Sequence, residues 1–159
     1  MMTARLAHSL SRVLVFRAHS NLCAVPLSCV LETMRPLPIE AFKDMPGFVR
    51  GLSIIRGSPF PVVDVGSLLG TNGQMPVTRF ITLRITETRG IALAVEEVIG
   101  VRELDPSLLQ RMPPLLHSAD SETVAAIGTL DGELLVILQE GKMLSENVWQ
   151  SLGMGGSAL

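Results

Sequence analysis

Residues 47–70 read GFVRGLSIIRGSPFPVVDVGSLLG, and this stretch decides the fold class. Two short apolar runs, at residues 51–55 and 61–65, are separated by the sequence Arg56-Gly57-Ser58-Pro59. Glycine adopts positive φ without a steric penalty and proline fixes its own φ, so this separator is typical of a turn. The stretch therefore predicts a β-hairpin.

Strand signals of the same kind recur along the rest of the chain. Short runs rich in Val, Ile and Leu are bounded by turn-forming residues, whereas long helical periodicity is absent. We expect strands at residues 13–16, 22–27, 51–55, 61–65, 80–85, 91–95 and 133–138, and short helical turns near residues 39–44, 107–111 and 141–148. The pattern predicts an all-β fold of many short strands.

The strand pattern occurs twice. Residues 12–17, RVLVFR, align with residues 79–84, RFITLR, and Ile55-Arg56-Gly57 aligns with Leu130-Asp131-Gly132. Such self-similarity indicates one supersecondary unit used twice. We expect a single domain at residues 10–150, built of two intertwined five-stranded barrel subdomains at about residues 12–75 and 76–150, with flexible termini at residues 1–9 and 151–159. Two small barrels should pack on each other and leave a groove between them.

Composition excludes several classes of protein. The chain has 159 residues, of which 47% are hydrophobic, and a net charge of −2, so neither disorder nor nucleic-acid binding is expected. No apolar run approaches the length of about 20 residues that crosses a bilayer, and the first residues do not read as a secretory signal. Cys23 and Cys29 lie in apolar segments, which favours reduced core thiols. We expect a cytoplasmic protein.

The sequence offers little for catalysis. The three histidines, His8, His19 and His117, lie in expected loops or termini, and none has a metal-ligand partner at the usual spacing. Asp64 follows an apolar strand and precedes a short apolar turn, where an aspartate acts as a helix N-cap. The repeat places Gln139 at the equivalent position, and glutamine caps poorly. We expect no catalytic residue, cofactor or metal.

Two arginines of the first hairpin are candidates for binding. Side chains alternate along a strand, so Arg50, Leu52, Ile54 and Arg56 share one face. If Leu52 and Ile54 point inward, the arginines emerge at the rims and present their guanidinium groups to another molecule. The hairpin therefore predicts a protein-binding surface.

Residues 48–57, FVRGLSIIRG, followed by PVVDV at residues 61–65, resemble the signature of CheW-like domains. The second half is similar to that family as well, at residues 90–101 and 126–138, and the resemblance covers about residues 12–149. It implies two SH3-like five-stranded barrels with apolar packing between them. It also implies a non-catalytic adaptor that links methyl-accepting chemoreceptors to the regulatory domain of the histidine kinase CheA, in the cytoplasm and at membrane-associated receptor arrays.

The resemblance also assigns roles to residues. Arg56 and Gly57 form the family's Arg-Gly turn, which bears on signalling contacts, and Val30 and Glu32 match positions associated with receptor binding. Arg50 stands at the other end of the same strand. The inter-barrel groove, which holds the helical tip of the receptor in the family, would be lined by Leu14, Val30, Val95, Val98 and Ile99. Packing in the core is the competing interpretation for each of these apolar residues.

Three departures from the family pattern leave further functions open. Ile54-Ile55 stands where Asn-Leu is usual, and Glu96 and Gln139 stand where aspartate is common. The chain could serve a divergent chemosensory system, such as one governing surface motility or development. The sequence is also compatible with a small-ligand-binding barrel that uses the groove, and with a self-assembling homo-oligomer.

Overall fold

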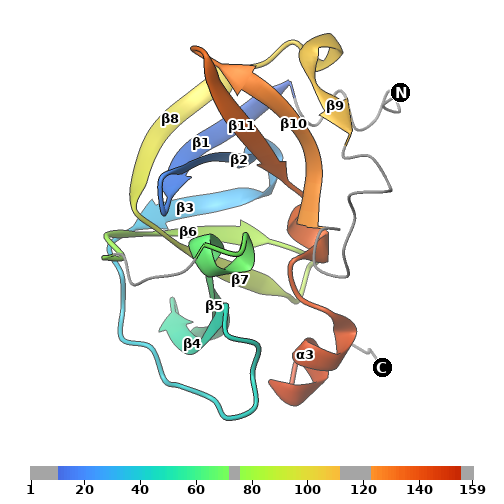
Figure 1. Ribbon diagram of the computed structural model, residues 1–159. Helices are drawn as coiled ribbons and strands as arrows, with labels where there is room; N and C mark the ends of the chain where they lie inside the picture. Colours follow the sequence, from blue (N-terminus) through green and yellow to red (C-terminus); the bar gives the residue numbers. More distant parts are fainter. Residues whose placement is uncertain (1–10, 72–75, 112–122, 155–159) are drawn as a thin grey trace.

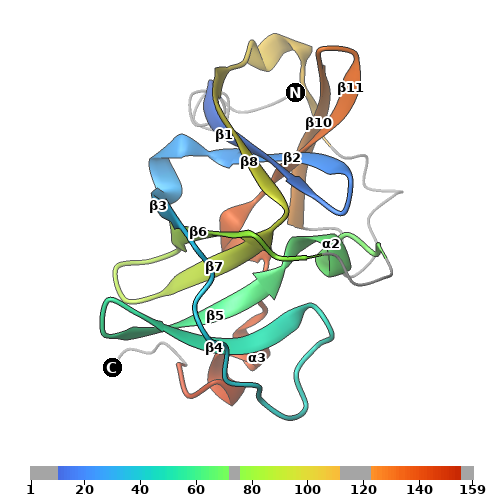
Figure 2. The ribbon, with the colours of Figure 1, turned by 90° about the vertical axis from the view of Figure 1, so that its left-hand side faces the viewer.

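The computed structural model describes residues 11–71, 76–111 and 123–154, and it is all-β as predicted. Two strongly curved sheets lie one above the other, and each curls into a small SH3-like barrel (Figures 1 and 2). Short helical turns connect several of the strands. The C-terminal helix α3 (Glu146–Ser151) lies beside the lower sheet.

The upper sheet has six strands in the order β8-β1-β2-β11-β10-β9. All neighbours are antiparallel except β2 and β11, which run parallel. The sixth strand adds only two residues to the edge, beyond the five that were expected. The strands are β1 (Arg12–Ala18), β2 (Asn21–Pro26), β8 (Glu97–Glu103), β9 (Gln110–Arg111), β10 (Val124–Leu130) and β11 (Glu133–Leu138).

The lower sheet has five strands in the order β3-β6-β7-β5-β4, again with one parallel pair, β5 and β7. Its strands are β3 (Val30–Met34), β4 (Val49–Ile55), β5 (Ser58–Asp64), β6 (Arg79–Arg84) and β7 (Gly90–Val95). The remaining helical turns are η1 (Leu27–Cys29), α2 (Val65–Leu68), η2 (Pro106–Leu108) and η5 (Glu140–Lys142).

Each sheet contains strands from both halves of the sequence. The upper order β8-β1-β2-β11-β10 matches the lower order β3-β6-β7-β5-β4, strand for strand. In each repeat, the strand after the first hairpin belongs to the other sheet. Strand β3 follows the upper hairpin β1–β2 but lies in the lower sheet, and β8 follows the lower hairpin β6–β7 but lies in the upper sheet. The halves at residues 12–75 and 76–150 therefore do not correspond to the two sheets, and the sheets are interlocked through the chain.

Three apolar clusters explain why several strands are apolar on both faces. The largest lies between the two sheets, and each sheet encloses a smaller one. Along β1, Leu14 and Phe16 face the central cluster, whereas Val13 and Val15 face the cluster inside the upper sheet. A strand buried on both faces reads as a continuous apolar run rather than as an alternation.

Several predicted elements were wrong or missed. The helical turn expected at residues 39–44 is absent, and Glu40 instead forms a β-bridge with Leu52. Residues 151–154 are not a flexible terminus, because Leu152 is buried and the Met154 carbonyl accepts a hydrogen bond from Arg89. Strands β3, β8 and β10 were missed because charged, alanine and glycine residues interrupt their apolar patterns.

The first hairpin turns more tightly than predicted. Arg56 and Gly57 alone form the loop, with φ of 50° and 82°, and Ser58 and Pro59 already belong to β5. Two successive residues with positive φ match the right-handed twist of the flanking strands. The second-repeat hairpin β10–β11 turns in the same way at Asp131 and Gly132.

Candidate partner-binding site

The structure brings two of the predicted binding residues together. Arg56 donates from Nε to Oε2 of Glu32 at 2.6 Å and from Nη2 to Oε1 at 2.9 Å. This two-point geometry matches the planar guanidinium to the carboxylate and fixes both side chains. The Arg56 side chain is 78% exposed and that of Glu32 is 29% exposed. A charged pair of defined shape therefore lies on the surface.

The pair forms because the lower sheet curls until its two edges approach each other. Glu32 lies on β3 and Arg56 follows β4, and these strands occupy opposite edges of the sheet. The chain after β3 closes the gap: Ser53 donates to the Pro38 carbonyl at 2.7 Å, and Glu40 exchanges two backbone hydrogen bonds with Leu52. The partners are 24 positions apart in the sequence, so local pattern could not reveal this contact.

Each member of the pair shifts the pKa of the other. Hydrogen bonds from Arg56 lower the pKa of Glu32, and hydrogen bonding to Glu32 raises the pKa of Arg56. Both side chains are charged near neutral pH. Because water screens an exposed ion pair, this contact contributes little to folding. Its charges are instead accessible to a partner.

Arg50, the second predicted binding arginine, is engaged within the fold. Its Nε donates to Oδ2 of Asp64 at 3.1 Å, and its Nη2 contacts the same oxygen. Asp64 also accepts from the Ser67 backbone N–H at 3.2 Å, so the prediction that it caps α2 is confirmed. Burial alone would raise the pKa of Asp64, but the hydrogen bonds from Arg50 and Ser67 outweigh it and hold that pKa low.

A histidine also reaches this carboxylate, contrary to the sequence interpretation. The Nε2 of His19 lies 3.7 Å from Oδ1 of Asp64, and both side chains are only 7% exposed. The ring packs so closely on Gly66 that a Cβ there would lie 1.8 Å from its Cδ2. The β1–β2 turn of the upper sheet is thereby fitted against α2 of the lower one. His8 and His117 lie outside the described residues.

The hairpin face predicted to point inward does so only in part: Leu52 packs against the central cluster, whereas Ile54 points to solvent. Ile54 is 62% exposed and Leu52 is half-buried, whereas Val49, Ser53 and Ile55 face the interior. The expected sharing of a face by Arg50, Ile54 and Arg56 is observed, but on the solvent side. Ile54 therefore adds an exposed apolar side chain next to Arg56.

The five residues predicted to line a groove have different environments. Leu14 and Val95 are 5% and 2% exposed and belong to the central core, so core packing accounts for them. Val30 and Val98 are half-buried at the margin of the same cluster. Ile99 packs against the upper cluster instead. Of the five, Val30 and Val98 are the two that combine partial exposure with a position beside the central core.

The cysteines are structural. Cys23 and Cys29 are both buried and free, and burial raises the pKa of each thiol to about 12. Such thiols stay protonated and unreactive at neutral pH.

Within the described ranges, no helix is long and apolar enough to cross a bilayer.

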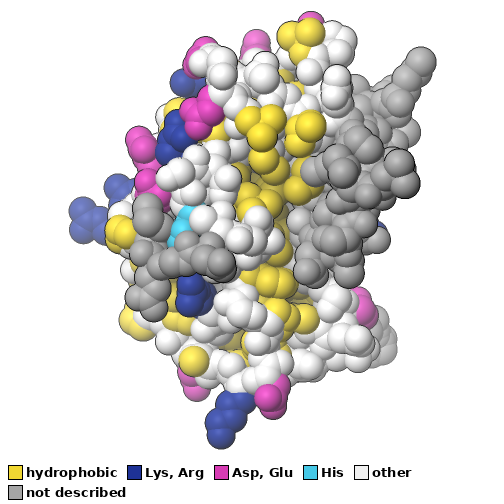
Figure 3. Space-filling model, viewed as in Figure 1, with side chains coloured by type: hydrophobic (Ala, Val, Ile, Leu, Met, Phe, Trp, Pro, Cys, Tyr) yellow, Lys and Arg dark blue, Asp and Glu magenta, His cyan; other side chains and the backbone are white. Residues whose placement is uncertain are grey.

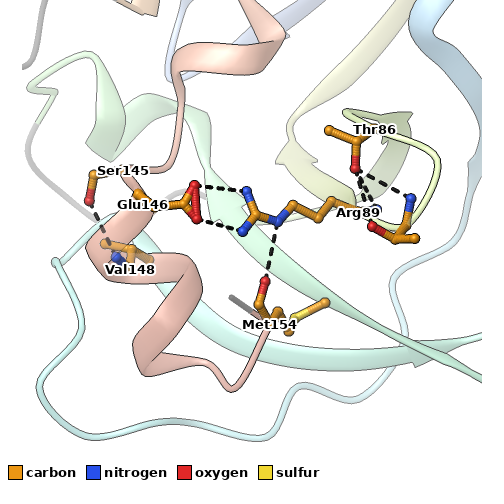
Figure 4. A network of polar contacts seen from close by, with 7 residues as sticks. Thr86, Arg89, Ser145, Glu146, Val148 and Met154 are labelled. Atoms are coloured by element: carbon orange, nitrogen blue, oxygen red, sulfur yellow. Dashed lines mark hydrogen bonds and ion pairs between the residues drawn. The ribbon is translucent and has the colours of Figure 1, made fainter. Parts of the chain in front are cut away.

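A second polar network, which the sequence did not reveal, joins α3 to the turn between β6 and β7. Arg89 donates to both carboxylate oxygens of Glu146, at 3.1 and 2.6 Å, and from Nε to the Met154 carbonyl at 3.2 Å (Figure 4). Its guanidinium also lies over the Trp149 ring, 4.8 Å from the centroid. Hydrogen bonding between Arg89 and Glu146 raises the pKa of Arg89 and lowers that of Glu146, so each charge is balanced by the other. It does not indicate a catalytic acid or base.

Comparison with known proteins agrees with this architecture. The model of the CheW-like domain matches residues 12–148. The chain is 20% identical over 135 residues to a probable chemotaxis protein CheW of Rhizobium etli, covering 84% of this chain and 87% of that protein. It is 20% identical over 128 residues to the chemotaxis protein CheW of Rhizobium meliloti, covering 80% and 83%.

A solved structure shows the same fold. The crystal structure of the scaffolding protein TtCheW from Thermoanaerobacter tengcongensis superposes with a TM-score of 0.70 at 23% identity, covering 84% of this chain and 97% of that chain. The family match spans far more than half of the sequence, with both sheets and the Glu32–Arg56 pair inside it. The chain belongs to the CheW-like domain family.

Proposed function

We propose that this chain is a non-catalytic coupling protein of a chemosensory system. It links methyl-accepting chemoreceptors to the histidine kinase CheA in the cytoplasm, at membrane-associated receptor arrays. The family match and the names of the relatives support the chemotaxis role. A coupling protein adds no chemistry; it fixes the geometry in which the state of one partner alters the activity of another.

The observation that carries this proposal is the exposed Glu32–Arg56 pair. Both residues come from positions that family resemblance assigns to partner contacts, and they form one surface feature although they lie on opposite sheet edges. Gly57 shapes the turn, and Val30 and Ile54 add apolar surface on the same two elements. A planar charge beside exposed apolar side chains is typical of interaction hot spots, where arginine is enriched.

Charge reversal at Arg56 tests the proposal. Because the side chain is exposed and its ion pair contributes little to stability, Arg56→Glu is expected to fold normally. We expect it to weaken capture of receptor or kinase by about tenfold in pull-down assays, as for loss of a hot-spot arginine. Arg12→Glu reverses another exposed arginine, on the upper sheet, and should leave capture unchanged.

A charge swap separates partner contact from fold maintenance. Glu32→Arg combined with Arg56→Glu can restore the ion pair in the opposite sense. If the pair acts only by holding β3 to the hairpin, the double variant should recover capture. If the pair contacts the partner, capture should stay weak, and this is the outcome we expect. Normal capture by Arg56→Glu of both partners would contradict the assignment.

A further inference from the structure

A pocket of about 590 Å³ opens between α3, η5, α2 and the β6–β7 turn. Its volume lies in the range of protein binding sites, which is about 300–1,000 Å³. The apolar part of the wall includes Phe48, Leu68, Ile85 and Trp149. On the face shown in Figure 3, apolar side chains extend from β10 and β11 toward this region. The pocket is distinct from the Glu32–Arg56 pair, because α3 and β3 lie on different sides of the molecule (Figures 1 and 2).

One wall of the pocket is fixed in place. Arg89, 13% exposed, holds Glu146 of α3 by two hydrogen bonds and stacks on Trp149. Ser145 caps α3 by accepting from the Val148 N–H at 3.3 Å (Figure 4). A wall held by such contacts needs little further ordering when a ligand binds, which favours affinity.

The charge of the lining indicates the chemistry of a ligand. Three charged side chains line the pocket: Arg89, Lys142 and Glu146. Arg89 and Glu146 neutralise each other, whereas Lys142 forms no ion pair with any described residue. The pocket therefore combines an apolar wall with one uncompensated positive charge.

We propose that this pocket binds a linear peptide segment of a partner protein that carries a large apolar side chain next to an acidic one. The apolar side chain packs against the half-buried Phe48 and Ile85, above the buried Leu68 and Trp149, and the carboxylate pairs with Lys142. The volume exceeds that of a single side chain, so several consecutive residues fit. The site does not depend on the receptor or kinase contacts proposed for Arg56.

The sole tryptophan of the chain, Trp149, lines the pocket and reports on it directly. We would titrate the full chain with acetyl-Leu-Phe-Asp-Glu-Leu-amide and follow Trp149 emission. The matched control is acetyl-Leu-Phe-Lys-Lys-Leu-amide, which has the same apolar residues and the opposite charge. Saturable change is expected with the acidic peptide, and at least about tenfold weaker binding with the basic one.

Two variants block the site in different ways. Gly141 lines the pocket, has no atom within 4 Å of a Cβ built on it and does not have positive φ, so Gly141→Leu is expected to add bulk at the lining without backbone strain. Lys142→Glu reverses the free charge. Each should weaken acidic-peptide binding at least about tenfold. The control, Lys43→Glu at an exposed lysine outside the lining, should bind normally.

The proposal is overturned if the acidic peptide leaves Trp149 emission unchanged. It is also overturned if Gly141→Leu binds as tightly as the unmodified chain, or if both peptides bind equally well. Should Gly141→Leu fail to fold, Lys142→Glu alone decides the question, because its side chain is on the surface. Neither readout contains a receptor or kinase, so a failure here leaves the coupling function untouched.

Discussion

At the scale of a single residue, the sequence position of Asp64 predicted only one of its contacts. Its place at the end of an apolar strand predicted the cap on Ser67, and the structure contains it. The contacts with Arg50 and His19 come from β4 and from the β1–β2 turn, 14 and 45 positions away. One carboxylate thus joins three segments, and the local pattern could indicate only one of them.

The low pKa of Asp64 makes a prediction about acid stability. A carboxylate with a depressed folded pKa contributes stability that is present above the unfolded value of about 3.9 and is lost as the pH falls through the folded pKa. Asp64→Asn keeps the cap but removes the charge, and should lower the free energy of unfolding by roughly 2 kcal/mol at pH 7.

That difference should shrink as the pH falls from 4 toward 2, measured by urea unfolding at each pH. Asp44→Asn is the control, because Asp44 is exposed and has a positive φ that asparagine tolerates. An Asp64→Asn deficit that is constant between pH 7 and pH 2 would refute the ionic explanation.

At the scale of the element, the two repeats end their hairpins differently. After β5 the chain enters α2 with the Asp64 cap, whereas after β11 it enters η5 with Gln139, whose side chain makes no capping hydrogen bond. The prediction of a weaker second cap agrees with this geometry. Elsewhere in the chain Asp105 caps a comparable 3-10 turn by accepting from the Ser107 N–H at 3.0 Å.

Installing a cap at position 139 should therefore strengthen η5. Gln139→Asp is expected to accept from the Gly141 N–H, as Asp105 does from Ser107, and to raise the free energy of unfolding by about 0.5–1 kcal/mol. Amide hydrogen exchange at Gly141 should slow accordingly. Gln139→Ala should give neither effect, and equal exchange in the aspartate and alanine variants would show that the cap does not form.

At the scale of the whole molecule, the sheets are fitted together through close packing as well as through the central core. His19 of the upper sheet fits over Gly66 of the lower one, and Asn21 donates to the Thr71 hydroxyl at 3.0 Å beside it. A methyl group at position 66 has no room while the buried ring stays in place.

This contact predicts a rescue experiment. Gly66→Ala should lower the free energy of unfolding by roughly 1–3 kcal/mol, because overpacking forces the ring or the helix to shift. Combining it with His19→Ala removes the obstacle, so the double variant should be more stable than the sum of the single effects. Strict additivity in thermal unfolding would show that the ring is free to move aside. Gly47→Ala, at an open site, should be neutral.

Local pattern could predict seven of the described strands and the two tight hairpin turns, but missed β3, β8, β9 and β10 and gave only part of the connectivity. The Arg-Gly and Asp-Gly turns and the apolar runs of β1, β5 and β7 are local features, and they are where expected. The crossing of β3 and β8 to the opposite sheets depends on pairings between distant residues, for which the chain carries no local signal. In β4 the solvent-facing position 54 also holds isoleucine, so the sequence lacks the apolar–polar alternation that would distinguish Ile54 from Ile55.

The interlocked strand order determines which sheet can complete its strand pairing first during translation. The strands of the lower sheet have all left the ribosome once Val95 has emerged, so that sheet can complete its pairing early. Hairpin β1–β2 belongs to the upper sheet, and β2 cannot complete its pairing until β11, which ends at Leu138, has been synthesised. Hairpin β1–β2 thus precedes every strand of the lower sheet in the chain, but its pairing is completed after theirs. Its face formed by Val13 and Val15, which packs against Leu135 and Ile137 inside the upper sheet, stays uncovered until β11 has been synthesised.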